Sequence, residues 1–172
     1  DGPYLKLGVS DGMDQPGLGF TENLKRIAEA GLVFPPGAAW LYSVSMDVLG
    51  GAVEQATGRS LGEVVAATVT DKLGMADTGF EVKDRSRLAR PYADGPPSRP
   101  MGPTHVVPFA ELSGIPFAPD RIFDPGSFPS GGAGMACSAP DFIVFLETIR
   151  QGGGPVVSSA PAAGGSSNPP GG

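Results

Sequence analysis

The fold of this chain is decided by residues 38–60, which read AAWLYSVSMDVLGGAVEQATGRS. Within this stretch apolar side chains recur every four positions, at Val44, Val48, Ala52 and Ala56. That spacing predicts an amphipathic helix packed on one face. Gly58 marks its end, because glycine readily adopts the left-handed conformation that closes a helix.

The entrance to this helix holds Tyr42 and Ser43, for which two interpretations stand. A tyrosine at a helix N-terminus lies in partial positive charge, which favours the phenolate, and a nearby lysine would make it a general base. Alternatively, Trp40 and Tyr42 pack at the helix entrance with a satisfied hydroxyl. On the local sequence alone, packing is the favoured interpretation.

Two capping boxes predict further helices. The first, SLGE at 60–63, opens a helix that ends near Gly74, and the second, SAPD at 138–141, opens a helix that ends at Gly152. The inward stripe predicted for the second of these helices is Phe142, Phe145, Leu146 and Ile149.

The segments between these helices show weaker patterns. Thr21 is a plausible N-cap for a short helix that ends at Gly31, whereas residues 1–20 read as irregular because they are dense in Gly, Asp and Pro. Residues 78–82, TGFEV, fit a short strand. The many prolines of residues 91–119 predict a long ordered loop.

The domain boundary is predicted at residue 151. Residues 1–151 have the composition of one folded domain, while residues 152–172 consist almost entirely of Gly, Ala, Ser and Pro. Such a tail buries too little apolar area to offset its conformational entropy, so we expect it to be flexible.

Charge and composition exclude several classes of partner. The net charge of −6 and the pI near 4.6 argue against nucleic acid and anionic membranes, which need clustered basic residues. No run of about 18 apolar residues and no signal-peptide pattern occurs, which predicts no membrane partner and favours a cytoplasmic protein over a secreted one. Cys137 and His105 are single residues of their kinds, so no metal or other cofactor is expected. We expect a small buried thiol and a loop imidazole.

The sequence DPGSFPSGGAGM at 124–135 is a second candidate feature. No lysine follows its glycines, so it is neither a P-loop nor a dinucleotide-binding fingerprint. It is either a turn-rich approach to the helix at 139 or a segment whose glycines allow close backbone approach to a neighbour.

The order of the motifs PGAAWLYS, LGMADTGF and SGGAGM resembles the serine β-lactamase-like superfamily, in particular the family VIII carboxylesterases related to class C β-lactamases. The resemblance covers roughly residues 1–153. It implies a mostly α fold with irregular loops, formed by the helical domain and part of the α/β domain of a β-lactamase/transpeptidase-like fold. It also implies that Tyr42 is catalytic, and that the substrate-binding residues are Ser43, Val44, Phe128, Ser130, Gly131 and Gly132.

Two departures from the family pattern shape the functional hypothesis. Val44 replaces the asparagine of lactamases, which favours esters over lactams. The chain has no Ser-x-x-Lys motif and no Lys-Thr-Gly, His-x-Gly or Trp-x-Gly motif. We therefore expect the middle part of a serine hydrolase of short-chain carboxylic esters, with the chain alone inactive.

Two alternatives stay open beside the esterase hypothesis. One is a non-catalytic binding module derived from the helical domain, and the other is a β-lactamase or penicillin-binding relative. The expected partner of the longer protein is a small-molecule ester. Self-association of the chain through an exposed apolar face is also expected, because a missing domain would leave such a face uncovered.

Overall fold

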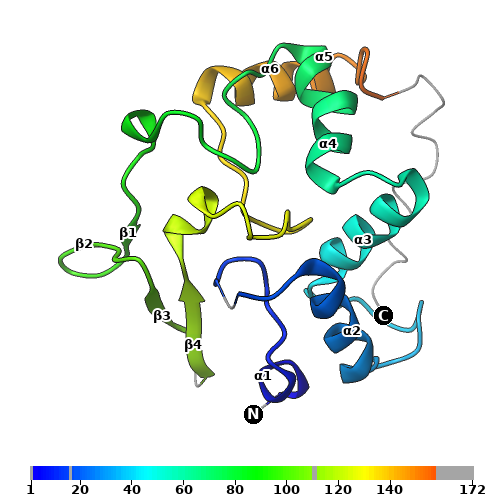
Figure 1. Ribbon diagram of the computed structural model, residues 1–172, viewed down its shortest axis with the longest axis vertical. Coiled ribbons are helices and arrows are strands. Elements are labelled where there is room, and N and C mark those ends of the chain that lie inside the picture. Colours follow the sequence, from blue (N-terminus) through cyan, green and yellow to red (C-terminus); the bar gives the residue numbers. More distant parts are fainter. Residues whose placement is uncertain (1, 16, 110–111, 158–172) are drawn as a thin grey trace, which may run out of the picture.

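The structure is a computed structural model that describes residues 2–15, 17–109 and 112–157. Its α-helices are α1 (Pro3–Leu7), α2 (Phe20–Ala30), α3 (Ser45–Thr57), α4 (Leu61–Val65), α5 (Asp71–Leu73) and α6 (Ala139–Arg150). A π-helical segment, η1 (Ala66–Thr70), joins α4 to α5, and two 3₁₀ turns are η2 (Arg85–Arg87) and η3 (Pro119–Phe123). In Figure 1 the helices α2, α3 and α4 form one side of the molecule and the strands form the other. The loop of residues 124–138, here called the glycine loop, crosses the middle.

The segment predicted as one long loop contains two antiparallel hairpins instead. The strands β1 (Tyr92–Ala93) and β2 (Arg99–Pro100) form the first, and β3 (His105–Phe109) and β4 (Leu112–Phe117) form the second. Proline is tolerated here because every strand of a two-stranded sheet is an edge strand, and Pro108 falls where the register shifts. The strand predicted at 78–82 does not form: only Gly79 bridges, to Ala136.

The predicted capping box at Ser60 forms completely, whereas at Ser138 only the serine side chain makes its capping contact. Ser60 accepts from the Glu63 amide at 3.3 Å, and the Glu63 carboxylate accepts from the Ser60 amide at 2.8 Å. At α6 the Ser138 hydroxyl accepts from the amide of Asp141 at 3.4 Å. The helix that opens at Ser60 runs to Gly74, where φ is 67°.

Several local predictions are wrong, both for the N-terminal residues and for Cys137 and His105. Residues expected to be irregular form α1, and α2 begins at Phe20 behind Gly19 instead of being capped by Thr21. Cys137 is exposed, and His105 lies in β3. The predicted flexible tail lies outside the described residues from residue 158 onward.

The interior of the described chain is unusually polar. Its most deeply buried side chains are Asn23, Asp47 and Ser10, at no more than 1% exposure. Arg121 at 6% and Ser130 at 2% are buried with them. We call these five residues the polar hub. They come from four separate stretches of chain, and the buried apolar residues are Leu61, Met75, Ala93, Ala118 and Phe128.

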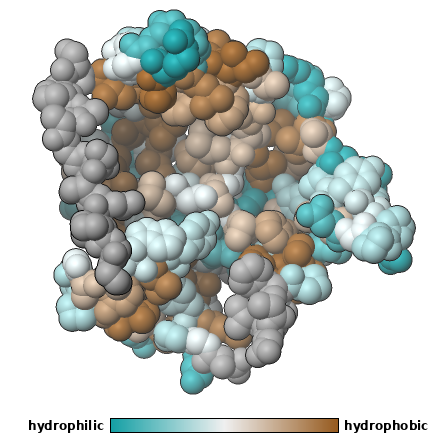
Figure 2. All heavy atoms as spheres, turned by 180° about the vertical axis from the view of Figure 1, so that it is seen from behind, coloured by the Kyte–Doolittle hydropathy of each residue, from teal (hydrophilic) through white to brown (hydrophobic). Residues whose placement is uncertain are grey.

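The apolar stripes predicted to face inward on α3 and α6 face outward. Val48 is 47% exposed, and Phe142 and Leu146 are about half exposed, at 52% and 50%. The helix α3 buries Asp47 and Gly50 instead. Figure 2 shows hydrophobic surface gathered at the end of the molecule where α6 lies. Periodicity identifies an apolar face, but whether another element covers it depends on the tertiary arrangement. Among the described helices, none is long and apolar enough to cross a membrane.

Candidate active site

Tyr42 stands on an exposed turn directly before α3. Its side chain is 87% exposed and that of Trp40 is 83% exposed, so neither packs at the helix entrance. The amide of Ser45 donates to the Ser43 hydroxyl at 3.2 Å, and Val44 occupies the N-cap position of α3 without a capping side chain. The Tyr42 hydroxyl has no hydrogen-bond partner among the described residues.

The glycine loop packs directly against the first turn of α3. A Cβ atom placed on Gly131 would lie 2.0 Å from the carbonyl oxygen of Met46, far inside van der Waals contact. A Cβ atom on Gly132 would lie 3.4 Å from Oδ2 of Asp47. Of the two interpretations of this loop, the structure selects close backbone approach to a neighbouring element. The two stretches predicted to hold the site are thereby brought together.

The predicted residues of the glycine loop divide between two faces. Phe128 is buried and stacks on Phe20 of α2 with ring centroids 5.2 Å apart. Ser130 is buried as well, and its hydroxyl accepts from the amides of Gly132 and Ala133, each at 3.1 Å. Gly132 is exposed and Gly131 is half-buried. Phe128 and Ser130 therefore support the loop from inside, while Gly131 lies against α3 and Gly132 is exposed.

Asp47 lies beneath this contact, in the first turn of α3. Burial raises the pKa of its carboxyl group, and the Ser130 hydroxyl, the Gly131 amide and the Arg121 charge partly oppose that effect. Its Oδ1 atom has no hydrogen-bond partner among the described residues. A buried carboxylate needs such compensation, and Asp47 receives it mainly from residues of the glycine loop.

Arg121 of η3 is the cationic member of the polar hub. Its Nη2 atom donates to the carbonyl of Phe128 at 3.1 Å, and its guanidinium lies 5.2 Å from the centre of the Phe128 ring. Burial lowers its pKa, while the charges of Asp14, Asp11 and Asp47 oppose the change. The sequence analysis missed both Asp47 and Arg121. For Asp47, an acidic residue in the first turn of a helix was the available signal, whereas no sequence signal marks Arg121.

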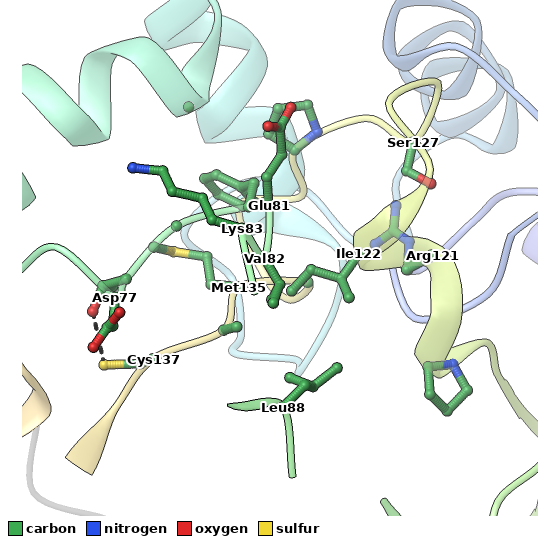
Figure 3. Close-up of a pocket in the computed structure, with 18 of the residues that line it drawn as sticks. Asp77, Glu81, Val82, Lys83, Leu88, Arg121, Ile122, Ser127, Met135 and Cys137 are labelled. Carbon is green, nitrogen blue, oxygen red and sulfur yellow. Dashed lines mark hydrogen bonds between the residues drawn. The ribbon is translucent and has the colours of Figure 1, made fainter. Parts of the chain in front are cut away.

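A cavity of about 1330 Å³ lies on the other side of the glycine loop. Figure 3 shows Val82, Leu88, Ile122 and Met135 around its middle, with Arg121 at one end and Cys137 at the other. None of the predicted site residues lines it. Residues 134–139 and Ser127 do, so part of the glycine loop borders this cavity. In the described part of the chain, no group of three His, Cys, Asp or Glu residues is arranged to hold a metal ion.

Comparison with known proteins places this geometry in a family. Residues 2–168 match the family described as Beta-lactamase. The chain belongs to the beta-lactamase family. The family resemblance inferred from the sequence motifs is thus confirmed, and the family match extends over nearly the whole chain.

The relatives of this beta-lactamase family chain include named esterases. Esterase EstB of Burkholderia gladioli is 47% identical over 154 residues, which are 88% of this chain and 39% of that protein. Lovastatin esterase of Penicillium rubens is 28% identical over 131 residues, which are 75% of this chain and 30% of that protein. The chain therefore spans only about a third to two fifths of the length of these relatives.

Solved structures agree with the family assignment. EstCE1, described as a hydrolase with promiscuous acyltransferase activity, superposes with a TM-score of 0.82 at 37% identity, over 91% of this chain and 42% of that one. A D-amino acid amidase of Ochrobactrum anthropi superposes with a TM-score of 0.56 at 15% identity, over 88% of this chain and 39% of that one, a likeness of fold alone. The β-lactamase/transpeptidase-like fold is therefore established for this chain.

Proposed function

We propose that this chain is part of a serine carboxylic-ester hydrolase of the family VIII type, to which it contributes one wall of the active site. The observation that carries the proposal is the 47% identity to Esterase EstB over a region that includes both Tyr42 and the glycine loop. The structure supports it by placing Gly131 against the start of α3, next to the exposed Tyr42 turn. The cleft wall then consists of Tyr42, Ser43, Val44 and the adjoining backbone of Gly131 and Gly132.

In this proposal Tyr42 moves the protons of an acyl-enzyme reaction. The phenolate oxygen accepts the proton of a serine hydroxyl as that oxygen adds to the ester carbonyl. The resulting phenol donates the proton to the departing alkoxide, which leaves as an alcohol. Water then adds to the acyl-enzyme with Tyr42 accepting its proton, and the proton returns to the serine when the acid is released. Because the Tyr42 side chain is 87% exposed, it is accessible to a nucleophile supplied by another segment.

Val44 sets the expected substrate class. It stands two residues after Tyr42, where its side chain can neither donate nor accept a hydrogen bond. A site without that polar contact gains nothing from an amide in the acyl group. We therefore infer that the enzyme takes short-chain esters with apolar acyl groups in preference to lactams.

The 172-residue chain contains no Ser-x-x-Lys motif, so we expect it to lack its own nucleophile. Treatment of this chain with a fluorophosphonate probe, read by intact mass and peptide mapping, should then give no adduct. A stoichiometric adduct on one serine that disappears in Tyr42→Phe would contradict this, because it would place the nucleophile inside residues 1–172.

Activity is tested on a longer protein that contains this chain. Hydrolysis of p-nitrophenyl butyrate, lost in Tyr42→Phe, is the expected result. Faster turnover of a chromogenic cephalosporin than of the ester would favour the lactamase alternative. A protein that turns over neither substrate but binds the ester would favour the non-catalytic binding module.

A further inference from the structure

We propose that Asp47 and Arg121 are positioning residues, whose buried contacts hold the glycine loop against α3 and so set the spacing between Tyr42 and the Gly131–Gly132 wall. The consequence for catalysis rests on the function proposed above. The positioning role itself does not rest on that function, because it concerns only how two segments of this chain are held together. Neither residue needs to touch substrate.

Arg121 is packed against the backbone of two separate segments. A Cβ atom on Gly134 would lie 2.9 Å from Arg121 Nη1, and one on Gly12 would lie 3.6 Å from the same atom. Both glycines have positive φ, 86° and 82°, where a side chain would be strained as well as crowded. With the bond to the Phe128 carbonyl, the guanidinium thus lies against the glycine loop at Phe128 and Gly134 and against the N-terminal loop at Gly12.

Asp47 lies against the middle of the same loop. Its carboxylate faces Ser130 and Gly132, and Ser130 in turn orders the loop by accepting from two of its amides. Asp47 lies one residue beyond Met46, whose carbonyl oxygen meets Gly131, and five beyond Tyr42. A shift of Asp47 therefore moves the helix start from which the Tyr42 turn emerges.

The polar hub is joined to α2 by the hydrogen bonds of Asn23. The side chain of Asn23 accepts from the Ser10 amide at 2.8 Å and donates to the Ser10 carbonyl at 3.0 Å. The Ser10 hydroxyl accepts from the Gly12 amide at 3.1 Å and donates to Asp14. Gly12 in turn abuts the Ser130 hydroxyl. The glycine loop thus packs between α2, through the N-terminal loop and the Phe20–Phe128 stack, and α3.

A positioning role explains the burial of Asp47 and Arg121 better than simple stabilisation does. Opposite charges buried together are seldom more stabilising than apolar packing of equal volume, because both must leave water. Asp47 Oδ1 and Arg121 Nε also lack hydrogen-bond partners in the described structure. Each group instead depends on its own contacts with the glycine loop: Arg121 donates to the Phe128 carbonyl, and Oδ2 of Asp47 lies against Gly132. The loop cannot slide without removing these contacts from two buried charged groups.

The test uses the chain itself. Hydrogen exchange of residues 40–47 and 128–134 is followed by mass spectrometry in Asp47→Ala, with Asp71→Ala as the matched exposed control. Trp40 is the single tryptophan of the chain and lies two residues from Tyr42, so its fluorescence anisotropy reports on the same turn. We expect about tenfold faster exchange in these two segments and larger-amplitude Trp40 motion, with unchanged far-UV circular dichroism. Asp47→Asn should restore part of the protection, and Asp71→Ala should change nothing.

Equal acceleration of exchange in all helices, with Trp40 motion unchanged, would overturn the proposal in favour of a purely structural hub. If Asp47→Ala fails to fold, Asp47→Asn and Ser130→Ala decide the matter, because both nearly preserve side-chain volume: local loosening supports the proposal and unchanged exchange refutes it. In a longer, active protein, Asp47→Asn should lower kcat by about tenfold with little change in KM. A protein without esterase activity would refute the proposed function. The hydrogen-exchange data would still test the positioning role of Asp47 and Arg121.

Discussion

Gly131 lies so close to Met46 that no side chain fits between the glycine loop and the start of α3: a Cβ atom on Gly131 would lie 2.0 Å from the Met46 carbonyl oxygen. The same contact brings two of the three motifs that carry the family resemblance, PGAAWLYS and SGGAGM, to neighbouring positions. A backbone carbonyl cannot rotate away as a flexible side chain can, so the contact fixes both segments.

Gly131→Ala should therefore be strongly destabilising. Overpacking against backbone costs about 1–3 kcal/mol or more, and urea unfolding followed by circular dichroism should show that loss. The matched control is Gly132→Ala, whose added Cβ would meet Asp47 Oδ2 at an ordinary 3.4 Å. A loss for Gly131→Ala no larger than that for Gly132→Ala would show that the loop is not held where the structure places it.

Tyr42→Phe should separate stability from activity. Because the ring is 87% exposed and its hydroxyl has no partner among the described residues, unfolding free energy should change by less than about 0.5 kcal/mol. In a longer protein with esterase activity, kcat should fall by about 10²–10⁴-fold, the usual contribution of a general acid–base group. The control is Tyr92→Phe, another exposed tyrosine. Equal activity losses in the two variants would remove Tyr42 from the mechanism.

Asp47 and Asp84 should give opposite pH dependences of stability. The pKa of Asp47 is raised above its ordinary value of 3.8, first by burial. Its native state thus holds the proton more tightly, and its contribution to stability is complete below pH 3.8 and lost as the pH rises through the folded-state pKa. The wild-type chain should therefore lose unfolding free energy relative to Asp47→Asn as the pH rises above 3.8.

The pKa of Asp84 is lowered from 3.8, first by the Ser86 hydroxyl. Its contribution is present above pH 3.8 and lost as the pH falls through the folded-state pKa. Relative to Asp84→Asn, the wild-type chain should gain stability as the pH rises toward 3.8. Urea titrations at several pH values measure both slopes. Slopes of the same sign for the two variants would contradict the burial of Asp47.

The capping box at the start of α4 should contribute measurably to stability. Ser60 accepts from the Glu63 amide, and its loss leaves one of the first amides of the helix without an intramolecular partner. Ser60→Ala should cost about 1 kcal/mol of unfolding free energy, measured by thermal or urea denaturation. Ser98→Ala, at an exposed serine with only a 3.5 Å contact to the Gly95 carbonyl, should cost almost nothing. An undiminished stability of Ser60→Ala would mean that water replaces the cap without loss.

The exposed apolar face of α6 should bind a hydrophobic dye and promote self-association. Ile143 is 65% exposed beside Phe142 and Leu146, and large contiguous apolar patches are uncommon on monomers. Ile143→Lys should reduce dye fluorescence and shift analytical ultracentrifugation profiles toward monomer. The control Gln151→Lys adds the same charge at an exposed site near the end of the same helix. A monomer that binds no dye would show that this face does not promote self-association in solution.

The candidate site could be located from the sequence only in part. Tyr42 and the glycine loop stood out because their motifs resemble a family in order and spacing, and the family assignment is confirmed. Their mutual contact was left open, since residues 42 and 131 are far apart in sequence and only the folded chain shows that Gly131 meets Met46. Asp47 and Arg121 were missed, because burial of a charge is a property of tertiary packing and leaves no periodic signature.

By itself, the sequence determined the local features of this protein. The helix at 45–57, the capping box at Ser60, the N-cap at Ser138 and the stop at Gly74 follow from interactions between residues within four positions of each other. Tertiary structure alone decided which faces are buried. It placed Asp47 rather than Val48 inside, formed hairpins from a proline-rich stretch and gathered the polar hub from four segments. Those outcomes depend on partners that are distant in sequence, and a helix stripe or a lone charge does not encode which partner it will meet.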